Sequence, residues 1–99
     1  MQRHTKIYFD KSGIDPHGFV PCEICQAQAV DVNHIDARGM GGDPTGSKDT
    51  FGNLQAACRD CHNEYGDISD LKPMLKKIHA KQFPTKLKYI EEMDQMIEL

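Results

Sequence analysis

Four cysteines have the spacing in this 99-residue chain that most clearly indicates chemistry. They form two pairs with two residues between the members, Cys22 with Cys25 and Cys58 with Cys61. Each pair brings two thiolates close enough to share one ion, and two such pairs give the tetrahedral four-sulfur coordination typical of structural zinc. The chain is short and 38% hydrophobic, so a bound metal would supplement a small core. We therefore predict one structural zinc ion held by all four cysteines.

Disulfides and redox chemistry are the alternatives for paired cysteines. The chain begins MQRHTKIYF and contains no apolar run long enough for a signal peptide or a membrane span. We therefore expect a cytoplasmic protein with reduced thiols and no membrane partner, which favours zinc over two disulfides. A thioredoxin-like site would need only one Cys-x-x-Cys pair near a βαβ pattern, and two pairs in so short a chain argue against it.

Two histidines and an asparagine indicate a second centre next to the cysteines. His34 ends a run of alternating β-branched residues, Asn53 follows a glycine-rich stretch, and His62 comes directly after Cys61. A histidine pKa lies near working pH, so His34 suits a general base. A zinc-bound Cys61 would hold His62 rigidly. The sequence leaves open that one of these histidines replaces a cysteine on the zinc, although four cysteines already satisfy a tetrahedral ion.

Two short strands, a loop and a helix are expected to position these residues. The alternation of β-branched residues predicts a strand over residues 29–35, with Asn33 and His34 pointing to opposite faces unless a bulge intervenes. Turn-forming residues predict a loop, and apolar residues beyond it predict a second strand and a helix. The predicted elements are the strand 29–35, the loop 38–52, a strand at 54–57 and a helix at 59–65 that ends at Gly66.

The last third of the chain predicts two more helices. Asp70 is a suitable N-cap for a helix that carries Pro73 in its first turn and runs to about Ala80. Thr85 is a suitable N-cap for a final helix with four apolar residues at helical spacing. These four residues are Leu87, Ile90, Met93 and Ile97.

Six lysines and no acidic residue lie between Leu71 and Ile90, although the net charge of the chain is −3. A basic segment of this kind could contact phosphate groups, and a solvated helix face explains it equally well on charge alone. We take Lys72, Lys76 and Lys77 as the candidate phosphate contacts.

With these features in this order, the chain resembles the HNH endonucleases. The resembling stretch reads CEIC, then VDVNHIDARGMGG, then FGNLQAACRDCHNEYGD. Two Cys-x-x-Cys pairs that bracket His34, a glycine-rich loop, an Asn-Leu and a Cys-His form a specific signal together. The resemblance implies an α+β fold, with a small ββα-metal (His-Me finger) core, a four-cysteine zinc ribbon and flanking helices. The chain length predicts a single domain over 1–99, with the zinc core at 22–67 and C-terminal helices at 68–99.

The resemblance also implies roles for the second centre. His34 would be the general base that activates water for hydrolysis of a DNA phosphodiester, and His62 would ligate a catalytic divalent cation such as Mg²⁺ or Mn²⁺. Asn53 would tie the loop through side-chain hydrogen bonds to backbone, so that His34 points correctly. The residue before the base is usually Asp or His in this family, where it is the second ligand of the cation, and here it is Asn33. An amide is a weaker ligand, so a catalytically weakened or inactive zinc-ribbon DNA-binding module is the alternative function.

DNA is the partner that the resemblance implies. Arg38 is the cation nearest to the base in sequence and joins the three lysines as a candidate DNA contact. The resemblance extends to small stand-alone nucleases encoded by phages, so a larger phage or host protein is a further expected partner. The sequence leaves open the oligomeric state, the DNA sequence preference, and whether one or both strands are cut.

Overall fold

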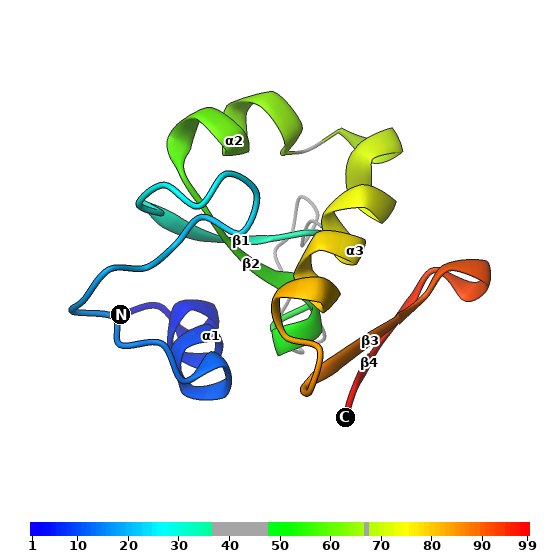
Figure 1. Ribbon diagram of the computed structural model, residues 1–99, viewed down its shortest axis with the longest axis horizontal. Helices are drawn as coiled ribbons and strands as arrows, with labels where there is room; N and C mark the ends of the chain where they lie inside the picture. Colours follow the sequence, from blue (N-terminus) through cyan, green and yellow to red (C-terminus); the bar gives the residue numbers. More distant parts are fainter. Residues whose placement is uncertain (37–47, 67) are drawn as a thin grey trace.

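The structure is a computed structural model, in which residues 1–36, 48–66 and 68–99 are described. These residues form three α-helices and two antiparallel sheets of two strands each, which is the mixed class predicted from the sequence (Figure 1). None of the described helices is long and apolar enough to span a membrane. In chain order the elements are α1 (Arg3–Ser12), β1 (Asp31–His34), η1 (Phe51–Asn53), β2 (Leu54–Ala57), α2 (Arg59–Tyr65), η2 (Ser69–Leu71), α3 (Lys72–Gln82), β3 (Leu87–Ile90), η3 (Glu91–Met93) and β4 (Gln95–Glu98), where η marks a 3₁₀-helix.

The β1–β2 hairpin lies in the middle of the molecule, with α1 and α2 on different sides of it (Figure 1). Its register places His34 opposite Leu54 and Asn33 opposite Gln55. Because side chains alternate along a strand, His34 and Leu54 share one face, and Asn33 and Gln55 share the other. All four residues of β2 are buried, so both faces of the hairpin are covered.

The main hydrophobic core joins the hairpin to both ends of the chain. Tyr8 of α1, Leu54 of β2 and Leu87 of β3 are at most 2% exposed. The cluster consists of Tyr8, Val20, Val32, Phe51, Leu54, Ala56, Phe83 and Leu87. A smaller cluster consists of Cys22, Ala57 and Cys61, so it contains one cysteine of each pair. Residues outside the hairpin, from both ends of the chain, therefore contribute to the burial that stabilises it.

A buried polar network crosses this core. The Glu23 carboxylate accepts hydrogen bonds from the hydroxyl of Tyr8 (2.6 Å) and from Nε2 of Gln55 (3.3 Å). The ring of His79, which is fully buried, lies 2.8 Å from Glu23 through Nδ1 and 2.7 Å from the carbonyl oxygen of Phe51 through Nε2. Both ring nitrogens of His79 therefore face an oxygen atom. The network connects α1, the first cysteine pair, β2 and α3.

The prediction of a helix from Thr85 is wrong, because residues 87–98 form the β3–β4 hairpin. A helix would bury its apolar stripe on one side, but here Leu87 is 2% exposed and Met93 is 65% exposed. Asp94 has φ of 47°, and this left-handed conformation reverses the chain between the strands. Residues 68–99 therefore contain one α-helix and a hairpin instead of helices alone.

The other predicted elements can be compared directly. The strands at 54–57 and near 29–35, and the helix at 59–65, are confirmed. Helix α3 carries Pro73 in its first turn as predicted, but Leu71, not Asp70, is its N-cap, and no side chain caps it. Most of the predicted loop 38–52 lies outside the described residues, and its last residues begin η1.

Candidate functional site

The four cysteines converge at one point. Their sulfur atoms all lie within 4.8 Å of one another, and the Sγ atoms of Cys25 and Cys58 are 3.6 Å apart. Zinc–sulfur bonds of about 2.3 Å in a tetrahedron place sulfur atoms about 3.8 Å apart, whereas a disulfide requires about 2.05 Å. All four thiols are free. The cluster therefore has the size and ligand set that could hold one zinc ion, as the spacing predicts.

Local backbone structure brings each cysteine pair into place. In the first pair the N–H of Cys22 donates to the carbonyl of Ala27 (2.6 Å), and the chain turns through Gln26 with φ of 69°. In the second pair Cys58 is the N-cap of α2, and its sulfur accepts a hydrogen bond from the N–H of Cys61 (3.5 Å). The cysteine that would bind the ion thus also caps the helix, so metal binding and helix formation are coupled.

Electrostatics also favours a metal at this cluster. Burial opposes a charge on Cys22, but hydrogen bonds from the backbone of Cys25, Cys58 and Ile24 outweigh it and lower the pKa of Cys22 to about 7. Burial, followed by hydrogen bonds with the neighbouring thiols, raises the pKa of Cys61. The protein thus favours the thiolate of Cys22 and opposes that of Cys61, and a bound divalent cation would stabilise the thiolate form of its ligands.

A cleft next to the cysteine cluster brings together three of the predicted site residues. Asn33 and His34 of β1 and His62 of α2 all line it. Cys61 lines the same cleft, one residue before His62. The zinc cluster and the candidate catalytic residues are therefore neighbours in space as well as in sequence.

Gly66 fixes the position of the His62 ring. A Cβ atom at this position would collide with the carbonyl oxygen of His62 and would lie 2.9 Å from its Nδ1 and 3.2 Å from its Cε1. The chain must therefore be glycine here for the ring to lie against the end of α2.

Asn33 has an unsatisfied amide. Its Nδ2 is buried and is the only such atom without a hydrogen-bond partner among the described residues. An unpaired buried polar group costs about 1–3 kcal/mol, so this site favours a ligand that could pair with the amide. The oxygen and nitrogen of an amide exchange by a simple flip, which would turn Oδ1 toward such a ligand. A divalent cation fits this requirement, since it accepts amide oxygen and imidazole nitrogen as ligands.

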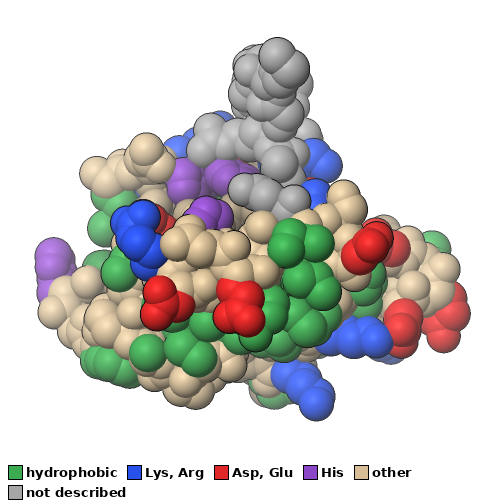
Figure 2. Space-filling model, turned by 90° about the horizontal axis from the view of Figure 1, so that it is seen from above, with side chains coloured by type: hydrophobic (Ala, Val, Ile, Leu, Met, Phe, Trp, Pro, Cys, Tyr) green, Lys and Arg blue, Asp and Glu red, His purple; other side chains and the backbone are tan. Residues whose placement is uncertain are grey.

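The ring of His34 has partners that the sequence analysis missed. Its Nε2 lies 2.6 Å from Oδ1 of Asp49, and the ring of His4 in α1 lies 4.6 Å away between centroids. Both partner residues are distant in sequence: Asp49 is one of several acidic residues in a polar stretch, and His4 has no motif around it. No local signal could have identified either. Figure 2 shows several histidine side chains close together, with another apart at the left edge of the view.

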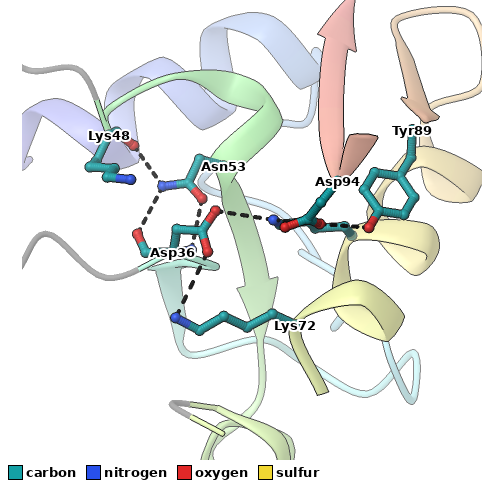
Figure 3. Close-up of polar contacts among 7 residues, drawn as sticks. Asp36, Lys48, Asn53, Lys72, Tyr89 and Asp94 are labelled. Atoms are coloured by element: carbon teal, nitrogen blue, oxygen red, sulfur yellow. Dashed lines mark hydrogen bonds and ion pairs between the residues drawn. The ribbon is translucent and has the colours of Figure 1, made fainter. Parts of the chain in front are cut away.

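Asn53 joins the two described segments that flank residues 37–47. Its Oδ1 accepts from the N–H of Asp36 (2.8 Å), and its Nδ2 donates to the carbonyls of Asp36 (3.0 Å) and Lys48 (2.9 Å). These contacts can be followed in Figure 3. They are side-chain-to-backbone bonds of the kind expected for Asn53 from the sequence. They hold the chain that leaves β1 just after His34.

Two of the three candidate lysines are paired with acidic residues at the same place. Lys76 is 6% exposed, and its Nζ lies 3.2 Å from Asp36 and 2.9 Å from Asp94. Burial opposes its charge, but the hydrogen bonds of Asp94 and Asp36 outweigh burial and raise the pKa of Lys76. Lys72 lies 3.8 Å from Asp36 (Figure 3). Lys76 therefore connects the end of β1 to the C-terminal hairpin and is not on the open surface.

The remaining candidate contacts with DNA differ in exposure. Lys77 is half exposed and forms an ion pair with Glu91 at 2.7 Å. Arg38 lies outside the described residues. Basic and acidic side chains are interspersed on the face shown in Figure 2, so that face has no continuous basic surface among the described residues.

Comparison with known families identifies the central segment. Residues 22–67 match the model of a family described as HNH endonuclease. The match is a little shorter than half of the chain, and it includes both cysteine pairs, β1, β2 and α2. Searches among curated proteins and among solved structures find no match to the chain. The family that the sequence motifs suggested is therefore confirmed for this segment.

Proposed function

Residues 22–67 belong to the HNH endonuclease family, and we therefore propose that this protein is a metal-dependent endonuclease that hydrolyses phosphodiester bonds of DNA. The observation that carries the proposal is the shared cleft of Asn33, His34 and His62 next to the cysteine cluster. Asn33 and His62 offer two ligand groups at this cleft, and His34, the neighbour of Asn33 in β1, would supply the base.

His34 would act as the general base. Its Nε2 donates to the Asp49 carboxylate, which leaves Nδ1 as the nitrogen that can accept a proton. In the proposed reaction Nδ1 takes a proton from water as the water oxygen attacks phosphorus. The bond from phosphorus to the 3′ oxygen then breaks, and protonation of that oxygen gives a 3′ hydroxyl and a 5′ phosphate. Asp49 would be a positioning residue, because it touches the base and not the substrate.

His62 and Asn33 would hold the divalent cation, and a structural zinc ion on the four cysteines would fix α2 and therefore His62. When bound, such a cation neutralises charge on the phosphate and on the departing oxygen. Asn53 would hold the segment after His34 in place through its three hydrogen bonds.

DNA would be held by a few cations at the rim of the site. Lys72 and Lys77 are the candidates with the more exposed side chains, whereas Lys76 would have to leave two carboxylates first. Arg38 is a further candidate. With a net charge of −3 and mixed surface charges, weak and strongly salt-dependent binding is expected unless a larger protein or a second copy contributes contacts.

Plasmid cleavage tests the proposal. Supercoiled DNA is incubated with purified protein and Mg²⁺ or Mn²⁺, next to His34→Ala and to His17→Ala, which removes an exposed histidine away from the cleft. We expect cleavage by the wild type and by His17→Ala, and at least a roughly 100-fold lower rate for His34→Ala. Cleavage by none of the proteins, together with DNA binding, would support the weakened binding module instead. Recovery of cleavage in Asn33→Asp would then locate the defect at the cation ligand.

A further inference from the structure

We propose that His4, His34 and Asp49 form a second metal site, distinct from the cysteine cluster and from the Asn33–His62 pair, which binds a divalent transition ion such as Zn²⁺ or Ni²⁺. The three residues come from α1, from β1 and from the segment before η1. One ligand atom of each residue lies within 4.8 Å of the other two. The family match begins at residue 22, so His4 belongs to a part of the chain that the family model does not describe.

Geometry and burial fit such an ion. Metal–ligand bonds of about 2.0–2.1 Å in a tetrahedron place ligand atoms about 3.3 Å apart, so the three groups need only small movements. The side chains of His34 and Asp49 are 11% and 7% exposed, and His4 is 7% exposed. Packing thus holds all three groups before an ion arrives, which lowers the cost of ordering the ligands.

The ligand set indicates the class of ion. Two imidazoles and one carboxylate suit Zn²⁺, Ni²⁺ or Co²⁺ better than Mg²⁺ or Ca²⁺, which prefer oxygen ligands. Three protein ligands leave one tetrahedral position for water. The ion would take Nε2 of His34, which lies 2.6 Å from Asp49, and the proton of the neutral ring would then reside on Nδ1. Because a doubly protonated ring cannot ligate a metal, binding strengthens as the pH rises. Arg3 lies 3.9 Å from the other oxygen of Asp49, and its side chain is 67% exposed, so it can move away from an incoming cation.

Occupation of this site would inhibit the enzyme, and this consequence rests on the proposed function. With an ion on Nε2 of His34, the proton of the neutral ring resides on Nδ1, the nitrogen that would accept a proton from water, and the ion adds a positive charge to the ring. The imidazole then becomes a poor proton acceptor. Excess Zn²⁺ should therefore suppress cleavage measured in Mg²⁺, and His4→Phe, which lacks a ligand of the second site, should resist this suppression.

Metal binding is measured on the full chain with the cysteine cluster already loaded with zinc. Co²⁺ is added, and its visible d–d absorption and the bound metal after gel filtration are recorded. Ligation by nitrogen and oxygen gives no sulfur-to-cobalt charge-transfer band, so this site is distinguishable from the cysteine cluster. The variants are His4→Phe and Asp49→Asn, which keep side-chain shape while removing a ligand or its charge, with His17→Ala and His62→Ala as controls. Zinc content and circular dichroism establish that each variant is folded.

We expect one additional ion per chain in the wild type, His17→Ala and His62→Ala, and at least about tenfold weaker binding in His4→Phe and Asp49→Asn. The proposal is overturned if no additional ion binds, or if the ion is lost in His62→Ala and kept in His4→Phe. The second result would assign the ion to the cleft and would leave the proposed function intact. If the ion binds as expected but the wild type does not cut DNA with Mg²⁺ or Mn²⁺, the metal site stands and the proposed function fails.

Discussion

Replacement of Asn53 tests whether this side chain holds the site together. Asn53→Ala removes three hydrogen bonds, two to the backbone of Asp36 and one to Lys48. Each such bond contributes about 0.5–1.5 kcal/mol, so the loss of all three should lower the free energy of unfolding by about 3 kcal/mol. Asn53→Asp should be at least as harmful at neutral pH, because it places a carboxylate oxygen opposite the carbonyls to which Nδ2 donates.

The measurement is urea unfolding followed by circular dichroism at a fixed concentration of free zinc, since zinc binding adds to apparent stability. Asn63→Ala on the exposed side of α2 is the matched control and should change stability by less than about 0.5 kcal/mol. Hydrogen exchange of the Asp36 amide should accelerate in Asn53→Ala, because Oδ1 of Asn53 is the acceptor of that amide. If Asn53→Ala unfolds like Asn63→Ala and the Asp36 amide stays protected, the idea that Asn53 joins the two segments is refuted.

Three further predictions concern the metal, the buried network and the end of α2. A chelator should remove one zinc per chain and abolish the helical signal in circular dichroism, because the Cys58 sulfur would bind the ion and also caps α2. A chelated protein that keeps this signal and its melting temperature would contradict the prediction. Burial, with the charge of Glu23, raises the pKa of Tyr8, so the folded protein keeps this proton above about pH 10, where the unfolded chain loses it. The contribution of this proton to the free energy of unfolding is complete below about pH 10 and falls as the pH rises. Tyr8→Phe should therefore make the alkaline loss of stability, measured by urea unfolding at several pH values, shallower by about 1.4 kcal/mol per pH unit. An unchanged slope would count against the network. Gly66→Ala should destabilise the protein by about 1–3 kcal/mol and shift the His62 ring signals in NMR spectra, because its Cβ has no room beside that ring, and unchanged signals would disprove the contact.

The parts of the site that the sequence predicted are those fixed by spacing. Cys22 and Cys25 are separated by one tight turn, and Cys58 and Cys61 by one helical turn, so local geometry alone brings each pair together. His62 directly follows Cys61 in the sequence, and strand alternation places the side chains of Asn33 and His34 on opposite faces of β1. Such short-range constraints are readable because they depend on few residues.

The parts that the sequence did not predict depend on contacts between distant segments. The helical spacing of apolar residues after Thr85 also suits a hairpin, and the choice was decided by burial of Leu87 in a core that includes Tyr8 and Phe51. Likewise, the contact of Asp49 with His34 requires the chain to return after residues 37–47. Neither the hairpin nor the Asp49–His34 contact has a local sequence pattern, so each could be predicted only with the tertiary packing known.

The same contacts bear on whether the segment 22–67 could fold alone. Strand β2 is buried on both faces, and part of that cover comes from residues outside the segment. Glu23 would lose the hydroxyl of Tyr8 and the ring of His79, and Gln55 would lose the carbonyl of Leu75 to which its Nε2 donates. The Glu23 carboxylate and the Gln55 amide would then lie beside an exposed apolar face, and each lost hydrogen-bond partner would lower the stability of the isolated segment. We infer that the N-terminal helix and the C-terminal third form one cooperative unit with the zinc-binding core, because they supply the packing and the hydrogen-bond partners that the core lacks.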